Sequence, residues 1–135
     1  MPDHALFITT DMFETVTPGA NFINPRCFGE DFAVWLKARL AERAVESGAP
    51  IQEDWGWALL ARQGGGAFTI SIGVMDEGIG RSLAEWRVGI DYEKSQNGIG
   101  AWFRAAPTAQ LQRVFAVLRE IAAAERRFAV SDTES

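Results

Sequence analysis

The sequence predicts an α+β fold: a two-layer sandwich in which two helices cover one face of an antiparallel sheet of four or five strands. Residues 53–62, 67–75 and 84–93 alternate between apolar and polar side chains, which is typical of strands covered on one face only. Residues 30–47 and 108–127 instead repeat their apolar side chains every three or four positions, as amphipathic helices do. The expected order along the chain is β-α-β-β-β-(β)-α, in layers that bury all of these apolar faces.

The first half of the chain is expected to contain a strand, a loop and the first helix. Residues 5–16 are rich in β-branched and aromatic side chains and predict a strand, either continuous or broken. The helix over residues 30–47 is expected to end before Gly48 and Pro50, which form a stop signal. Its apolar stripe consists of Phe32, Leu36, Leu40 and Ala44.

Three alternating segments form the centre of the predicted sheet, joined by turns at residues 63–66 and 76–83. A short fifth strand is expected over residues 99–104, and Pro107 suits the first turn of the last helix. The side chains expected on the apolar face of the three strands are Trp55, Trp57, Leu59, Ala61, Phe68, Ile70, Ile72, Val74, Trp86, Val88, Ile90 and Tyr92.

Length and composition indicate one domain. A chain of 135 residues has the usual size of a single domain, and no change in composition marks a second one. The hydrophobic fraction of 47% and charged fraction of 23% are close to globular averages, which argues against disorder. We expect residues 1–130 to fold as one α+β domain and the polar residues 131–135 to form a flexible tail.

Charge and cysteine content narrow the classes of partner and compartment. The net charge is −5 and the basic residues are scattered, so nucleic acid is not an expected partner. No signal peptide is visible, and no apolar run approaches the roughly 18 residues of a membrane span. The single cysteine, Cys27, excludes an internal disulfide and suits a reducing compartment. The sequence therefore predicts a cytoplasmic protein without membrane contact.

No residue pattern predicts a catalytic centre, a metal site or a cofactor. Cys27 and His4 are the only cysteine and histidine, and His4 lies near the chain end, so a small buried thiol is the favoured interpretation of Cys27. One histidine and one cysteine cannot supply the common zinc ligand sets. The adjacent Glu53 and Asp54 would point to opposite faces of a strand, which argues against a paired-carboxylate site.

The five tryptophans divide into two groups. Trp35, Trp55, Trp57 and Trp86 fall on apolar faces and are expected to fill the core. Trp102 lies in a glycine-rich segment between elements, where it either covers the core or serves as an exposed binding anchor.

The alternation also predicts a strand register. Aligning the apolar faces of the three central strands pairs Ile72 with both Trp57 and Val88. The opposite face then carries three rows of residues. Its Gly, Ala and Ser residues form a shallow trough with Arg87 and Asp91 on one flank. The expected rows are Gly56, Gly73 and Arg87; Ala58, Ser71 and Gly89; and Leu60, Thr69 and Asp91.

Glycines in strands mark a close approach of other atoms, so something is expected to lie near this trough. The three interpretations are the 94–106 segment folding back, a second copy of the chain, and a foreign partner or ligand. The candidate binding residues are Ser71, Arg87, Asp91 and Trp102.

Three functions are compatible with these observations. The first is a non-enzymatic protein-interaction module, such as a small regulator, inhibitor or immunity-type protein, that uses the open sheet face. The second is a small-molecule-binding domain with an aromatic pocket next to Trp55, Trp57 or Trp86 and a polar group pointing in. The third is a minimal enzyme in which Arg87 and Asp91 converge with another ionisable group in a cleft.

Overall fold

The computed structural model describes residues 4–64, 66–92 and 108–133. Two α-helices and seven strands form within these residues, together with one short 3-10 helix, η1. The elements in chain order are β1 (His4–Thr10), α1 (Glu30–Ala41), β2 (Glu46–Ser47), β3 (Ile51–Glu53), β4 (Gly56–Gln63), β5 (Gly66–Val74), η1 (Asp76–Gly78), β6 (Ala84–Tyr92), α2 (Thr108–Ala124) and β7 (Ala129–Ser131).

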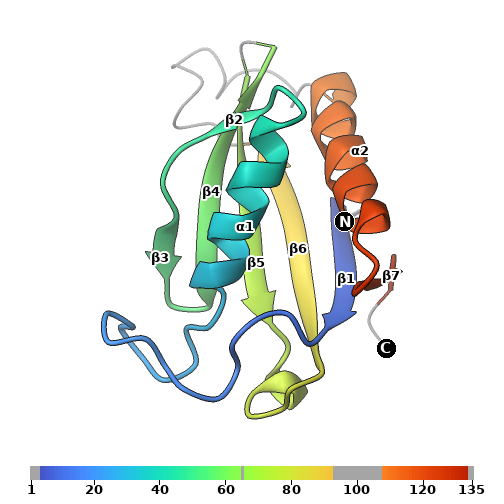
Figure 1. Cartoon of the computed structure of the whole chain (residues 1–135). Coiled ribbons are helices and arrows are strands. Elements are labelled where there is room, and N and C mark those ends of the chain that lie inside the picture. The colour runs from blue at the N-terminus through green and yellow to red at the C-terminus, as the bar shows by residue number, and fades with distance from the viewer. Residues whose placement is uncertain (1–3, 65, 93–107, 134–135) are drawn as a thin grey trace.

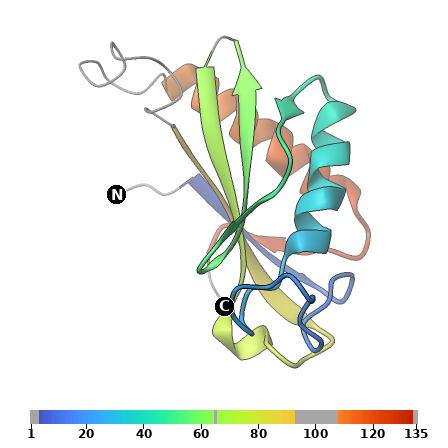
Figure 2. The same cartoon turned by 90° about the vertical axis from the view of Figure 1, so that its left-hand side faces the viewer.

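The strands form a single antiparallel sheet with both helices on one face. The order across the sheet is β2-β4-β5-β6-β1-β7, and the short β3 also pairs with β4. Figure 1 shows α1 and α2 side by side in front of the sheet, and Figure 2 shows α1 standing clear of one side of the twisted sheet, with α2 behind the strands. The predicted α+β fold is therefore confirmed, with more strands than the four or five expected.

The core lies between the helices and the sheet. The α2 helix buries a stripe of apolar side chains with helical spacing, and the large apolar side chains that alternate along the central strands are buried in the same core cluster. An aromatic group links α1 to this core: the Phe32 ring lies 5.4 Å from Trp86 and 5.9 Å from Phe128, measured between ring centroids. The side chains that α2 buries are Leu111, Val114, Leu118, Ile121 and Ala122.

The predicted end of the first helix is wrong. The α1 helix ends at Ala41 instead of residue 47, because Ala44 adopts a left-handed φ of 61°. The backbone N–H of Val45 donates to the Leu40 carbonyl over 3.0 Å, and that of Ala44 donates to the Ala41 carbonyl over 3.1 Å. These two bonds form a Schellman motif, which usually requires glycine at the left-handed position. The chain then turns into β2 before reaching Gly48.

Other boundaries also differ from the sequence prediction. The first strand stops at Thr10 rather than residue 16, and the short strands β2, β3 and β7 are absent from the prediction. The β7 strand includes Ser131, which pairs with Phe7 of β1 although it is the first residue of the expected tail. The expected strand at residues 99–104 lies outside the described residues. Neither described helix combines the length and apolar character that crossing a bilayer requires.

Candidate functional site

The face of the sheet opposite the helices, here called the open face, has the register that the sequence predicts. On β5, Ile72 pairs with Trp57 of β4 and with Val88 of β6, and all three side chains are buried on the helix side. A shift by one residue would turn each of these large apolar side chains toward solvent. The hydrophobic pattern therefore fixes which side chains reach the open face.

Two of the three expected rows cross the open face as predicted, and the third does so in part. Thr69 lies between Leu60 and Asp91, and Gly73 pairs with Arg87, but the pairing of β4 with β5 ends at Trp57 and Ile72 and does not include Gly56. The middle row contains only small residues on the three central strands. Its members are Ala58, Ser71 and Gly89.

Residues of these rows on β5 and β6 line a shallow hollow with a volume of about 360 Å³. Three of the four predicted binding residues, Ser71, Arg87 and Asp91, line it together. The fourth, Trp102, lies outside the described residues, as does the 94–106 segment that could cover the trough. The lining residues are Trp55, Thr69, Ser71, Gly73, Val74, Met75, Arg87 and Asp91.

The prediction that Trp55 belongs to the core is wrong. Its side chain is 51% exposed and lines the hollow at the β4 side. The strand that contains Trp57 begins at Gly56 rather than at residue 53, so Trp55 lies outside it. Gly56 has a φ of 151°, and the chain turns there between β3 and β4. A glycine inside an alternating segment often marks a bend, so Gly56 is the signal in the sequence that this strand begins later.

The glycines of the open face do mark close approaches, but the approaching atoms belong to this chain. A Cβ atom on Gly56 would collide with the carbonyl oxygen of Ile72, and one on Gly73 would lie 3.1 Å from the carbonyl oxygen of Trp55. On β6, a Cβ atom on Gly89 would lie 2.7 Å from Nη1 of Arg87. The Arg87 guanidinium therefore lies over Gly89, toward the middle row.

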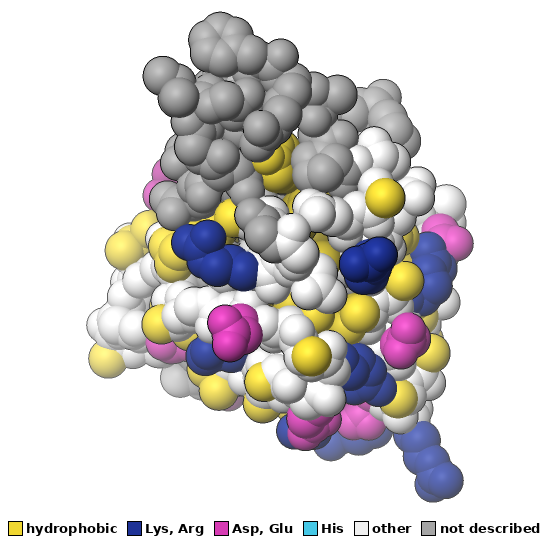
Figure 3. Space-filling view, turned by 90° about the horizontal axis from the view of Figure 1, so that it is seen from above, with side chains coloured by type: hydrophobic (Ala, Val, Ile, Leu, Met, Phe, Trp, Pro, Cys, Tyr) yellow, Lys and Arg dark blue, Asp and Glu magenta, His cyan; other side chains and the backbone are white. Residues whose placement is uncertain are grey.

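Arg87 and Asp91 are the two ionisable residues among the described lining of the hollow. Each lies two positions from Gly89 on β6, on the same face, and their formal charges cancel. Elsewhere, acidic and basic side chains are interspersed over the end of the molecule seen in Figure 3. The described part of the hollow thus lacks the third ionisable group that the enzyme hypothesis requires.

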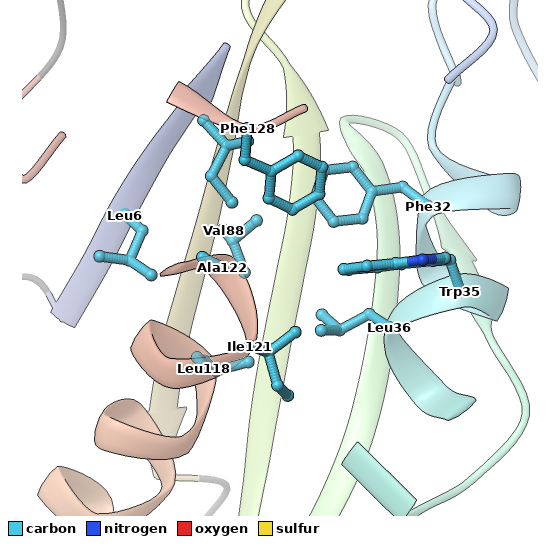
Figure 4. Close-up of a pocket in the computed structure, with 10 residues that line it drawn as sticks. Leu6, Phe32, Trp35, Leu36, Val88, Leu118, Ile121, Ala122 and Phe128 are labelled. Carbon is cyan, nitrogen blue, oxygen red and sulfur yellow. The ribbon is translucent and has the colours of Figure 1, made fainter. Parts of the chain in front are cut away.

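The space between sheet and helices is almost completely filled. Its cavity measures about 10 Å³ and is lined by apolar side chains from β1, β6 and both helices, several of which point toward one another in Figure 4. This volume is close to the room that one water molecule occupies. This cavity therefore has no room for an aromatic ligand, whereas the hollow on the open face sets polar side chains beside Trp55.

Cys27 is a buried structural thiol. Its Sγ donates to the carbonyl oxygen of Glu53 over 3.1 Å and lies 3.5 Å from that of Gly56. Burial, with smaller contributions from nearby carboxylates, raises the pKa of the Cys27 thiol above its ordinary value of 9.0. His4 belongs to β1 and packs edge-on against Phe115, with ring centroids 5.5 Å apart. The described residues thus do not form a Cys–His nucleophile pair.

Within residues 4–64, 66–92 and 108–133, no three or more His, Cys, Asp or Glu side chains gather as a metal site would require. No protein-family model, curated protein or solved structure matches the chain. The candidate site is therefore defined by geometry and chemistry alone, as the hollow on the open face.

Proposed function

We propose that the protein is a non-enzymatic interaction module that binds a protein partner through the open face. The observation that carries this proposal is the position of Trp55, half exposed, at the edge of a hollow that also contains Ser71, Arg87 and Asp91. Tryptophan and arginine are enriched among the few residues that supply most of the binding energy at protein–protein interfaces. The hollow lies on the open face, opposite the face on which Trp57, Ile72 and Val88 are buried.

The shape of the hollow favours a protein over a small molecule. Small-molecule sites enclose most of their ligand, whereas this hollow is shallow and lies on a sheet surface. Two opposite charges beside a middle row of small residues suit a partner that presents its own pair of charges.

A small ligand is the second candidate, favoured by one observation. The volume of about 360 Å³ falls at the lower end of ligand pockets, and Trp55 offers a surface for stacking beside the polar side chains. A small ligand would leave the mass of the complex almost unchanged, which separates it from a protein partner.

The proposal includes a cytoplasmic location. A single buried thiol without a disulfide partner suits a reducing compartment.

The test is comparative affinity capture with three baits: the wild-type protein, Ser71→Trp and Val34→Trp. Ser71 lines the hollow, whereas Val34 is 56% exposed on the outer face of α1 and serves as the matched control. The same lysate, supplemented with a differently tagged copy of this chain, is used for all three baits. We expect at least one protein to be retained by wild type and Val34→Trp and lost by Ser71→Trp.

The control for misfolding is the free energy of unfolding of each bait. Because the introduced indole would point away from the core, the stability of Ser71→Trp should stay within about 1 kcal/mol of wild type. Retention of the same proteins by all three baits, or loss that follows only a fall in stability, would remove the open face as the binding surface.

A further inference from the structure

We infer that the partner on the open face is a second copy of this chain, stacked face to face about a two-fold axis. The inference rests on the proposed function, because it names the occupant of that same face. The middle row of the open face extends across five strands of the sheet, β3, β4, β5, β6 and β1. Ala58 pairs with Ser71, Ser71 with Gly89, and Gly89 with Ala5 of β1.

This row is where two sheets can approach most closely. Ala5 and Ala58 are nearly buried between their neighbours, and Gly89 has no side chain. At the edge, the row ends in Ile51 of β3, which pairs with Ala58 and is 49% exposed. A two-fold axis along the row would place Ile51 against Ile51 of the second copy. The exposed Ile51 side chain of each copy would then be covered by Ile51 of the other copy.

The same axis exchanges the two flanking rows. Because Arg87 and Asp91 lie two residues on either side of Gly89, the rotation places Arg87 opposite Asp91 of the second copy, and the reverse. The guanidinium has five N–H donors, so it can bind this carboxylate in addition to contacts within its own chain. One pair of residues thus supplies two symmetric ion pairs.

Steric fit follows the same exchange. On β5, Gly73 of one copy faces Thr69 of the other. This contact sets a side chain against a residue that has none, which lets the two sheets approach. The small angle of roughly 30° between stacked sheets leaves the central contacts in place.

Charge favours a second copy over a simple anion or cation. The chain carries a net charge of −5, so two copies repel least where the surfaces that meet have no local net charge. The described lining of the hollow is such a place, because it holds one Arg and one Asp. An anion bound to Arg87 would be repelled by Asp91, and a cation bound to Asp91 by Arg87. A second copy places a charge of opposite sign against each of them.

Sedimentation velocity over a concentration series from micromolar to near-millimolar tests the inference. The samples are wild type, Val34→Trp, Ser71→Trp, Arg87→Asp, Asp91→Arg, the double variant, and an equimolar mixture of the two single charge variants. Circular dichroism establishes that each variant is folded. We expect wild type and Val34→Trp to dimerise and Ser71→Trp to remain monomeric.

The charge variants supply the signature of the two-fold axis. In Arg87→Asp, an aspartate at position 87 lies opposite Asp91 of the second copy. In Asp91→Arg, an arginine at position 91 lies opposite Arg87. Because like charges then face each other, each single variant should dimerise at least tenfold more weakly than wild type. The equimolar mixture should form a heterodimer, because every facing pair is then opposite in charge. The double variant should recover the homodimer for the same reason.

Several results would overturn the inference. They are a wild-type protein that stays monomeric throughout, dimers that Ser71→Trp leaves intact, and charge variants whose mixture behaves as the separate samples do. If a charge variant does not fold, the wild-type and Ser71→Trp samples still decide the outcome. A monomeric wild type that nevertheless retains another protein in a Ser71-dependent manner would remove the second copy and leave the proposed function standing. Failure of both experiments would remove both proposals.

Discussion

The turn that carries Trp55 depends on glycine at position 56, and this dependence can be measured. Gly56 has a φ of 151°, a conformation that residues other than glycine rarely adopt. A Cβ atom there would also collide with the backbone carbonyl of Ile72 on the neighbouring strand. Gly56→Ala therefore combines two unfavourable effects at one position: backbone strain and a collision with atoms that cannot easily move.

The expected loss follows from these two effects. Strained backbone costs roughly 1–3 kcal/mol, and overpacking against a fixed neighbour adds about 1–3 kcal/mol. The sum of about 2–6 kcal/mol is a large part of a domain's total stability, which is typically about 5–15 kcal/mol. Gly56→Ala should thus be severely destabilised.

Two other glycines separate the effects. Gly80 has a φ of 86° and no atom within 4 Å of the position that a Cβ atom would take, so Gly80→Ala should show the strain alone. Gly48 has neither a left-handed φ nor a close neighbour, and Gly48→Ala should be neutral or stabilising by up to about 1 kcal/mol. Urea denaturation followed by circular dichroism gives all three free energies of unfolding. A loss in Gly56→Ala no larger than that in Gly80→Ala would refute the collision.

Three further predictions concern the core, the end of α1 and the buried thiol. Ile72→Ala and Leu118→Ala should each lower the free energy of unfolding by about 2–5 kcal/mol, since both side chains are buried; a loss below about 1 kcal/mol in urea denaturation would contradict their place in the core. Ala44→Gly should stabilise the protein by about 1 kcal/mol, because glycine adopts the left-handed φ without strain; an unchanged or lower denaturation midpoint would argue against that conformation. The raised pKa of the Cys27 thiol means that the folded protein holds this proton more tightly than the unfolded chain. The stability that the protonated thiol contributes is fully present below the thiol pKa of the unfolded chain and is lost as pH rises through that of the folded protein. Wild type should therefore lose more stability than Cys27→Ala above pH 9.0. Parallel profiles of stability against pH for the two proteins would contradict this prediction.

The central sheet was predictable because its pattern is redundant. Ile72, Trp57 and Val88 belong to three separate alternating segments, and only one register buries all of them together. That register then placed Ser71, Arg87 and Asp91 on the open face without any information about their function.

The parts that failed lack such redundancy. The alternation of Trp57 continues backward to Trp55 in the sequence, but a single backbone angle at Gly56 ends it. The helical repeat of α1 continues to Ala44, but an alanine rather than a glycine adopts the left-handed position that ends the helix. Strands of two or three residues, such as β2, β3 and β7, are too short to show a period at all.

Whether the open face is a contact surface can be read from two-dimensional NMR spectra of the wild-type protein at increasing concentration. We expect progressive shifts in the backbone amide signals of Ser71, Gly89 and Arg87, while the amides of α1 around Val34 stay unchanged. Shifts confined to the helices, or spectra that do not change with concentration, would contradict self-association through this face.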